Sequence, residues 1–233
     1  MKTIVVTGGP CSGKTSALEA LRERMAAEGI PAVFVTEAGT DLILDGVSPL
    51  SLGSMLPFQT QVAALQIQRE DAARQEALAL EEKMRANASA KKAGPTTNVL
   101  DPDAPKNPDS EAPAPEALVI CDRGICDGAA YLDARDYAQA LEANGLTHDT
   151  AMKRYDAVFC LESMAHLGDA MYTTQNNSAR SENAAEAAAL DKRTHRAWKE
   201  HPHFHFVPNK PTFAQKADHL ISLILENVYI FSS

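Results

Sequence analysis

The sequence predicts an α/β fold in which a parallel sheet is covered by helices on both faces. Two observations point to it. Short apolar segments, each the length of a buried strand, alternate along the chain with longer helical patterns. The first apolar segment also runs directly into a glycine-rich loop and then into a helix. This order is typical of open parallel sheets, whose loops gather at the carboxyl ends of the strands.

The first strand, loop and helix carry the strongest pattern. Residues 3–7 form a β-branched run, and residues 8–15 fit G-x-x-x-x-G-K-[ST]. The helix that follows repeats Leu18, Leu21 and Met25 and is expected to end at Gly29. A glycine-rich turn with an unrelated lysine is the alternative interpretation, and it explains the flanking strand and helix less well.

The loop predicts that a nucleoside triphosphate, ATP or GTP, binds here with Mg²⁺. Gly8 and Gly13 allow consecutive N–H groups to point at phosphate oxygens, aided by the positive end of the helix dipole. Lys14 is expected to reach the β- and γ-phosphates and Thr15 to offer its hydroxyl to Mg²⁺. The expected nucleotide contacts are Gly8, Gly9, Pro10, Cys11, Ser12, Gly13, Lys14, Thr15 and Ser16.

The middle of the chain predicts one more strand and a long helix before the composition changes. The strand covers 32–36 and ends at Glu37, and the polar helix covers about 58–84. Residues 87–116 are rich in proline and polar residues and bury too little apolar area to offset chain entropy. We expect a single domain over 1–233 with a flexible insertion at 87–116.

Three further strands follow the insertion, at 117–121, 157–161 and 204–207. Helices are expected from Asp133 to Leu141, near 150–154, over about 182–200 and from Pro211 to the end. The core face of the last helix is predicted to hold Phe213, Ala217, Leu220, Ile221 and Ile224.

Composition excludes several classes of partner. A net charge of −9 disfavours nucleic acid and anionic membrane surfaces. No apolar stretch reaches the roughly 18–20 residues of a membrane span, and residues 1–7 lack the apolar core of a signal peptide. Cys121 and Cys160 end apolar runs, as buried thiols do in a reducing compartment. We therefore expect a cytoplasmic protein.

Polar residues follow the strands at the edge where the loop lies. Glu37 could accept a proton from an acceptor hydroxyl, or it could cap a helix. Asp122 ends the third strand, where a carboxylate can join the Mg²⁺ shell, although a turn aspartate is the alternative. Arg123 could hold an acceptor or the phosphates, or lie on the surface. Because parallel strands end at one edge, these residues should converge.

An arginine on a closing lid is expected to stabilise the transferred phosphoryl group. Arg180 is the first candidate, with Arg193 and Arg196 behind it. The alternative is that these arginines pair with Glu182 and Glu186 on a solvated helix. Three alternating histidines, His201, His203 and His205, lack a clear fourth ligand for zinc, so we do not predict a zinc site.

The combined motifs resemble those of a known family. They are the loop T-G-G-P-C-x-G-K-T, Thr36-Glu37-Ala38, C-D-R-G at 121–124 with Asp127-Gly128, Tyr172-Thr173, and N-N-x-A-R-x-E at 176–182. The set resembles the P-loop AAA-domain family that includes NadR-type nicotinamide riboside kinase domains and the GTP-binding protein of the TRPL-translocation defect.

The resemblance implies a P-loop NTPase fold, a kinase-like three-layer sandwich with strand order 2-3-1-4-5 and a helical lid. Glu37 and the Asp122–Arg123 pair are similar in placement to residues of deoxynucleoside kinases. Asn209, just after the last strand, matches a position near the nucleotide base. The resemblance does not extend to the additional domains fused to some relatives.

Two functional hypotheses follow. The first is an ATP-dependent kinase acting on a hydroxyl of a small nucleoside-like acceptor, with Lys14, Glu37, Asp122, Arg123 and Arg180 as catalytic residues and Thr15 and Asp122 as Mg²⁺ ligands. The alternative is an ATP- or GTP-binding switch that hydrolyses slowly and has no acceptor. Residues 209–212 begin like the GTPase motif N-K-x-D but end in threonine. A scaffold that has lost nucleotide binding is a third possibility.

Overall fold

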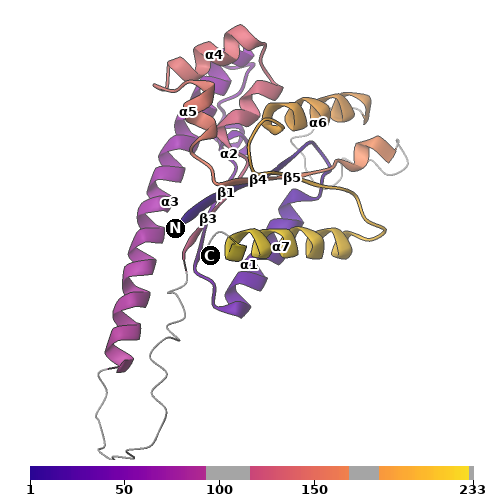
Figure 1. Ribbon diagram of the computed structural model, residues 1–233. Coiled ribbons are helices and arrows are strands. Elements are labelled where there is room, and N and C mark those ends of the chain that lie inside the picture. Colours follow the sequence, from indigo (N-terminus) through magenta and orange to yellow (C-terminus); the bar gives the residue numbers. More distant parts are fainter. Residues whose placement is uncertain (93–115, 168–183, 231–233) are drawn as a thin grey trace, which may run out of the picture.

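A computed structural model describes residues 1–92, 116–167 and 184–230 (Figure 1). Within these residues, one sheet is formed by β1 (Lys2–Gly8), β2 (Ala32–Val35), β3 (Leu118–Asp122), β4 (Ala157–Leu161) and β5 (Phe204–Val207). All neighbouring strands are parallel, and their order is β2-β3-β1-β4-β5. Both the parallel direction and the order confirm the predicted P-loop α/β fold.

The helices connect successive parallel strands, except for the last one, which follows β5. They are α1 (Lys14–Glu28), α2 (Ala38–Leu44), α3 (Met55–Lys92), α4 (Ala134–Glu142), α5 (His148–Met152), α6 (Ala184–Trp198) and α7 (Phe213–Ile230). Two short 3₁₀ helices follow strands, η1 (Ile125–Ala130) after β3 and η2 (Met164–Leu167) after β4.

The sheet is the middle of three layers. Helices α1 and α7 cover one face, and α3, α4, α5 and α6 lie on the other (Figure 1). In β1, Ile4 and Val6 pack with α1 and α7, whereas Val5 between them packs on the opposite side. Each buried aliphatic side chain contributes about 1.5–3 kcal/mol, so the central strand holds the layers together from both sides.

Two details of the predicted elements are wrong. Helix α3 continues to Lys92, into the segment 87–116 that was predicted to be an insertion, because the alanines and lysines there are good helix formers. Phe213 was expected on the core face of the last helix, yet 45% of it is exposed. As the first residue of α7 it lies beyond the sheet, against the glycine-rich loop. Residues 93–115, the remainder of that segment, lie outside the described residues.

The described helices give no candidate for a membrane span, since none is both long and apolar enough. The thiols of Cys121, Cys126 and Cys160 are free and buried, as was expected for Cys121 and Cys160. Burial raises the pKa of the Cys126 thiol to about 12, so it stays protonated at neutral pH.

Candidate functional site

The glycine-rich loop between β1 and α1 has the strained backbone that its sequence requires. Its φ angles are 152° at Gly8, 57° at Cys11 and 79° at Gly13. A Cβ on Gly8 would lie 2.5 Å from the carbonyl oxygen of Leu161, and one on Gly13 would lie 2.8 Å from the Phe213 ring. Both glycines are therefore needed, for the conformation and for the close approach of neighbouring chain.

Two residues that sequence reasoning missed hold this loop from α6 and from the end of β4. Asp191 of α6 accepts hydrogen bonds from the N–H of Gly9 at 2.8 Å and from the N–H of Ser163 at 3.3 Å. The hydroxyl of Ser163 donates to the carbonyl oxygen of Pro10. Asp191 is buried, as are Ala187, Thr194 and Trp198 of the same helix. An aspartate at helical spacing within a buried stripe was the available signal for its role.

Lys14, Glu37, Asp122 and Arg123 meet at the carboxyl edge of the sheet, as predicted. The ammonium group of Lys14 pairs with Asp122 and lies 3.6 Å from Oε2 of Glu37. Nε of Arg123 donates to Oε1 of Glu37 at 2.8 Å. Two carboxylates and two cations thus alternate along one chain of ion pairs, which starts beside the phosphate-binding loop.

The electrostatics of this cluster keep Glu37 ionised. Burial raises the pKa of Glu37, but the charges of Arg123 and Lys14 outweigh it and lower the pKa to about 2. Burial raises the pKa of Asp122, and the Lys14 ammonium offsets part of that rise while Glu37 adds to it. Glu37 is therefore a carboxylate throughout the neutral range, and it is oriented by two cations.

Arg123 sits on a strained turn that is hydrogen-bonded at every step. Its φ is 67°, which costs a non-glycine residue about 1–3 kcal/mol unless neighbours hold it. Its N–H donates to Val6 O at 3.0 Å, and its carbonyl accepts from Gln66 Nε2 at 3.2 Å. The N–H of Gly124 donates to Asp127 at 2.8 Å. Backbone strain that neighbouring residues stabilise is common at functional sites, where a side chain must keep one orientation.

Glu70 of α3 supports this turn through its hydrogen-bond partners, and the sequence analysis did not predict this role. Its carboxylate is fully buried and accepts from Gln66 at 3.1 Å, from Tyr155 Oη at 2.7 Å and from Arg154 Nε at 3.0 Å. Tyr155 Oη in turn accepts from the N–H of Ile125 at 2.8 Å. Glu70 therefore supports Gln66 and Tyr155, two of the side chains that bond the turn. A glutamate at helical spacing within the buried residues 63, 66, 70, 73 and 77 could have indicated a buried carboxylate with structural partners.

A cavity of about 300 Å³ opens beside Glu37 and Arg123. Helices α2 and α3 and the turn after β3 form its walls, with Ile43, Phe58 and Tyr131 among the lining residues. The carboxamides of Gln59 and Gln66 line it as well. A mostly apolar pocket with a few polar groups is the usual form of a small-molecule site. No motif in the sequence had predicted this pocket.

Thr15 and Asp122, the expected Mg²⁺ ligands, line a second, smaller cavity of about 140 Å³. A hydroxyl and a carboxylate facing one space are oxygen donors of the kind Mg²⁺ prefers, with water and phosphate completing its shell. The residues present therefore fit the ion. Thr15 and its neighbour Ser16 are both exposed at the start of α1.

Three of the remaining predicted residues, Arg180, Arg193 and Asn209, have different outcomes. Arg180 lies outside the described residues. Arg193 does not reach the phosphate-binding loop, because its Nε donates to the carbonyl oxygen of Ala130 at 2.7 Å. Asn209 lies near the loop and is hydrogen-bonded through Nδ2 to Ser163 O at 3.2 Å and through Oδ1 to Lys216 Nζ at 2.8 Å.

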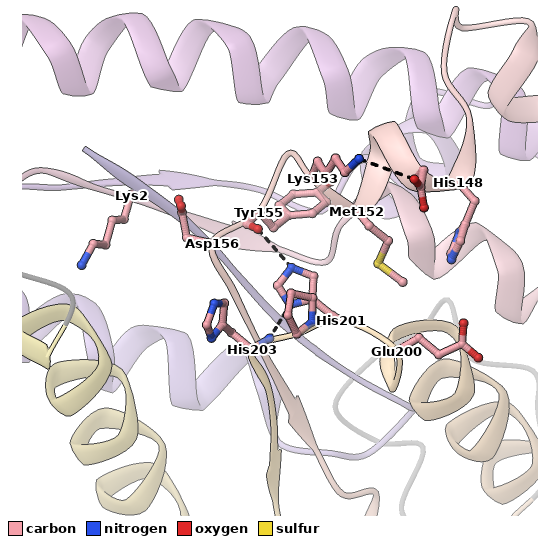
Figure 2. Close-up of a pocket in the computed structure, with 11 residues that line it drawn as sticks. Lys2, His148, Met152, Lys153, Tyr155, Asp156, Glu200, His201 and His203 are labelled. Atoms are coloured by element: carbon pink, nitrogen blue, oxygen red, sulfur yellow. Dashed lines mark hydrogen bonds and ion pairs between the residues drawn. The ribbon is translucent and has the colours of Figure 1, made fainter.

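A larger cavity, of about 510 Å³, lies at the opposite, amino edge of the sheet. Figure 2 shows two of its histidines, His201 and His203, beside Tyr155 and Asp156. Nε2 of His201 bonds the carbonyl oxygen of Tyr155 at 3.0 Å, and Nδ1 accepts from the N–H of His203 at 3.2 Å. Both ring nitrogens are therefore engaged with backbone. Among the described residues, no cluster of three or more His, Cys, Asp or Glu side chains is arranged to hold a metal ion.

The strained loop after β1 and the ion-pair cluster beside it define a P-loop nucleotide-binding protein. A family model described as an AAA domain matches residues 3–101 and 106–216. The chain therefore belongs to this P-loop AAA-domain family. A search of curated proteins gave no match.

Proposed function

We propose that the protein is a kinase that transfers the γ-phosphoryl group of ATP to a hydroxyl group of a small, nucleoside-like molecule. The observation that carries the proposal is the cavity of about 300 Å³ in which Glu37 and Arg123 face one space beside Lys14. Hydrolysis of the nucleotide requires only water as the acceptor, whereas a kinase needs a second pocket next to these groups to bind its acceptor. The volume lies within the range of small-molecule sites.

The lining of the cavity supports an acceptor with a flat ring. Phe58 and Tyr131 offer aromatic faces, and Ile43 adds an aliphatic wall. The carboxamide of Gln59 can both donate and accept hydrogen bonds, as recognition of a heterocycle requires. The hydroxyl-bearing part of the acceptor would then lie toward Glu37, where the phosphoryl group arrives.

In the proposed reaction the acceptor oxygen attacks the γ-phosphorus, and the bond from that phosphorus to the β,γ-bridging oxygen breaks. ADP leaves with the electron pair, and Glu37 accepts the hydroxyl proton. With a pKa of about 2, Glu37 is a weak base but is always ionised, so it acts chiefly by orienting the hydroxyl. Orientation is what a loose phosphoryl-transfer transition state demands.

Lys14 is proposed to leave Glu37 and Asp122 for the β- and γ-phosphates when the nucleotide binds. Thr15 and Asp122 would hold Mg²⁺, which neutralises charge on the phosphates when bound. Arg123 keeps Glu37 in place through the 2.8 Å hydrogen bond. Arg180, outside the described residues, is proposed to stabilise the transferred group.

The proposal is tested by incubating purified protein with Mg²⁺ and ATP against a panel of nucleosides and detecting phosphorylated products by mass spectrometry. Glu37→Gln should lower acceptor-dependent turnover by about 10²–10⁴-fold, because a neutral carboxamide holds the acceptor hydroxyl less firmly than a carboxylate does and cannot accept its proton. Its affinity for ATP should stay close to that of the wild type, since the phosphate-binding loop is unchanged.

One outcome supports the alternative function. If no acceptor is phosphorylated above the rate of ATP hydrolysis, and GTP binds as tightly as ATP or more tightly, the protein is better described as a nucleotide-dependent switch. That result would contradict the kinase proposal and leave nucleotide binding untouched.

A further inference from the structure

Three consecutive carbonyl groups of the phosphate-binding loop are bonded to groups outside the loop. Pro10 O accepts from the hydroxyl of Ser163. Cys11 O accepts from the N–H of Met164 at 3.2 Å, and Ser12 O accepts from Nζ of Lys216 at 2.8 Å. Ser163 and Met164 follow β4 in the chain, and Lys216 lies on α7, so all three carbonyls point to segments outside the loop.

The direction of these carbonyls determines where the following N–H groups point. In a planar trans peptide the C=O of one residue and the N–H of the next point in opposite directions. Holding the carbonyls of Pro10 and Ser12 outward therefore turns the N–H groups of Cys11 and Gly13 inward, where phosphate oxygens bind.

Lys216 differs from the other two partners because it carries a charge. The residue is buried, with only 3% of it exposed. Besides Ser12 O its ammonium group donates to Glu162 O at 2.6 Å and to Asn209 Oδ1 at 2.8 Å, which uses the three donors of an ammonium group. One side chain of α7 thus joins the loops that follow β1, β4 and β5.

We propose that Lys216 is a positioning residue of the nucleotide site: its ammonium group holds the Ser12 carbonyl outward so that the phosphate-binding loop presents its N–H groups to the nucleotide. It touches no phosphate and works through the backbone. Asn209, expected from the family resemblance to lie near the base, serves here as the support between Lys216 and Ser163. The inference depends on nucleotide binding alone and not on the identity of an acceptor.

The environment of Lys216 makes this role dependent on pH. Burial lowers its pKa, and the nearby carboxylates Glu162 and Asp191 offset part of the effect, leaving a pKa of about 8. Above that pH the neutral amine has two N–H donors for three acceptors. Burial also raises the pKa of the Cys160 thiol, so that thiol stays uncharged there.

The experiment is calorimetric titration of a Mg²⁺-bound, non-hydrolysable ATP analogue at pH 7 and pH 9. The wild type should bind about tenfold more weakly at pH 9, because most of its Lys216 is then neutral. Lys216→Met should bind about tenfold more weakly at pH 7 and show little further change at pH 9. The matched control, Lys153→Met at the exposed Lys153–Asp149 pair, should behave as the wild type does.

The proposal is overturned if Lys216→Met binds with wild-type affinity, or if it keeps the wild-type dependence on pH. Lys216→Arg covers the case in which the methionine variant does not fold, since a guanidinium stays charged at pH 9. Affinity in Lys216→Arg should change less than twofold between pH 7 and pH 9. A persisting tenfold change would assign the titration to another group and contradict the proposal.

Discussion

The two edges of the sheet both carry a cavity with ionisable side chains, yet their chemistry differs. At the carboxyl edge, Lys14, Glu37, Asp122 and Arg123 bond to one another, and the backbone at Cys11 and Arg123 is strained. At the amino edge, the cavity is larger, but the ring of His201 is bonded to backbone on both sides (Figure 2).

The difference teaches that cavity size alone does not locate a functional site. The ion pairs at the carboxyl edge are largely shielded from water, unlike the exposed Lys153–Asp149 pair at the amino edge, and they can exchange partners when a charged ligand arrives. Side chains bonded to backbone, as His201 is, hold the fold instead. The parallel strands explain the asymmetry, because helix N-termini and their N–H groups point to the carboxyl edge.

The largest expected effect tests the comparison directly. Lys14→Ala should lower kcat/KM for the nucleotide by at least about 100-fold, because it removes the phosphate contact and leaves Glu37 and Asp122 with one cation fewer. Lys153→Ala, the same change at the amino edge, should leave kcat/KM within about twofold. Steady-state kinetics at several nucleotide concentrations measure both. Equal losses in the two variants would contradict the assignment of function to the carboxyl edge.

Tyr155 gives an intermediate effect because it belongs to both regions. It lines the amino-edge cavity, while its hydroxyl accepts from Ile125 N–H beside the Arg123 turn. Tyr155→Phe should reduce the free energy of unfolding by about 1–2 kcal/mol, since a buried N–H loses its acceptor. Turnover should also fall, by about tenfold, as Arg123 is aimed less well.

Urea unfolding and turnover measurements check this prediction, with Tyr137→Phe as the control. The hydroxyl of Tyr137 contacts His148 at 3.2 Å and the buried thiol of Cys126, and neither partner is bonded to Arg123, so its loss should leave turnover within about twofold of the wild type. If Tyr155→Phe loses stability but keeps full turnover, the turn does not depend on Tyr155 for its alignment.

The smallest effect is expected at His201. Burial lowers its pKa below the ordinary 6.5, so the unfolded chain takes up a proton more readily than the folded protein does. The stability that neutral His201 provides is present above pH 6.5 and is lost as the pH falls below it. The wild type should therefore lose up to about 1 kcal/mol more than His201→Gln between pH 7 and pH 5.5.

Thermal melting at the two pH values measures this difference. Burial also lowers the pKa of His205, and this effect of burial is present in both proteins. Turnover of His201→Gln at pH 7 should match the wild type within about twofold. A large loss of turnover would show that the amino edge takes part in the reaction.

The sequence by itself determined the architecture and the phosphate-binding loop. Apolar strand segments and helix caps are local patterns, so β4, β5 and the capping of α4 by Asp133 could be read directly. The convergence of Glu37, Asp122 and Arg123 could also be predicted, because parallel topology alone carries the ends of β2 and β3 to the edge where Lys14 lies.

Only the tertiary structure decided how the site is held. Asp191, Glu70 and Lys216 come from three different helices and bond to backbone or side chains far away in sequence. No local sequence pattern predicts which carbonyl oxygen a buried lysine will bind. Nor does one predict that the Phe213 ring packs against Gly13 instead of in the core. These partners depend on how helices pack over the sheet, and burial then enforces them, because an unpaired charge in the interior is too costly to persist.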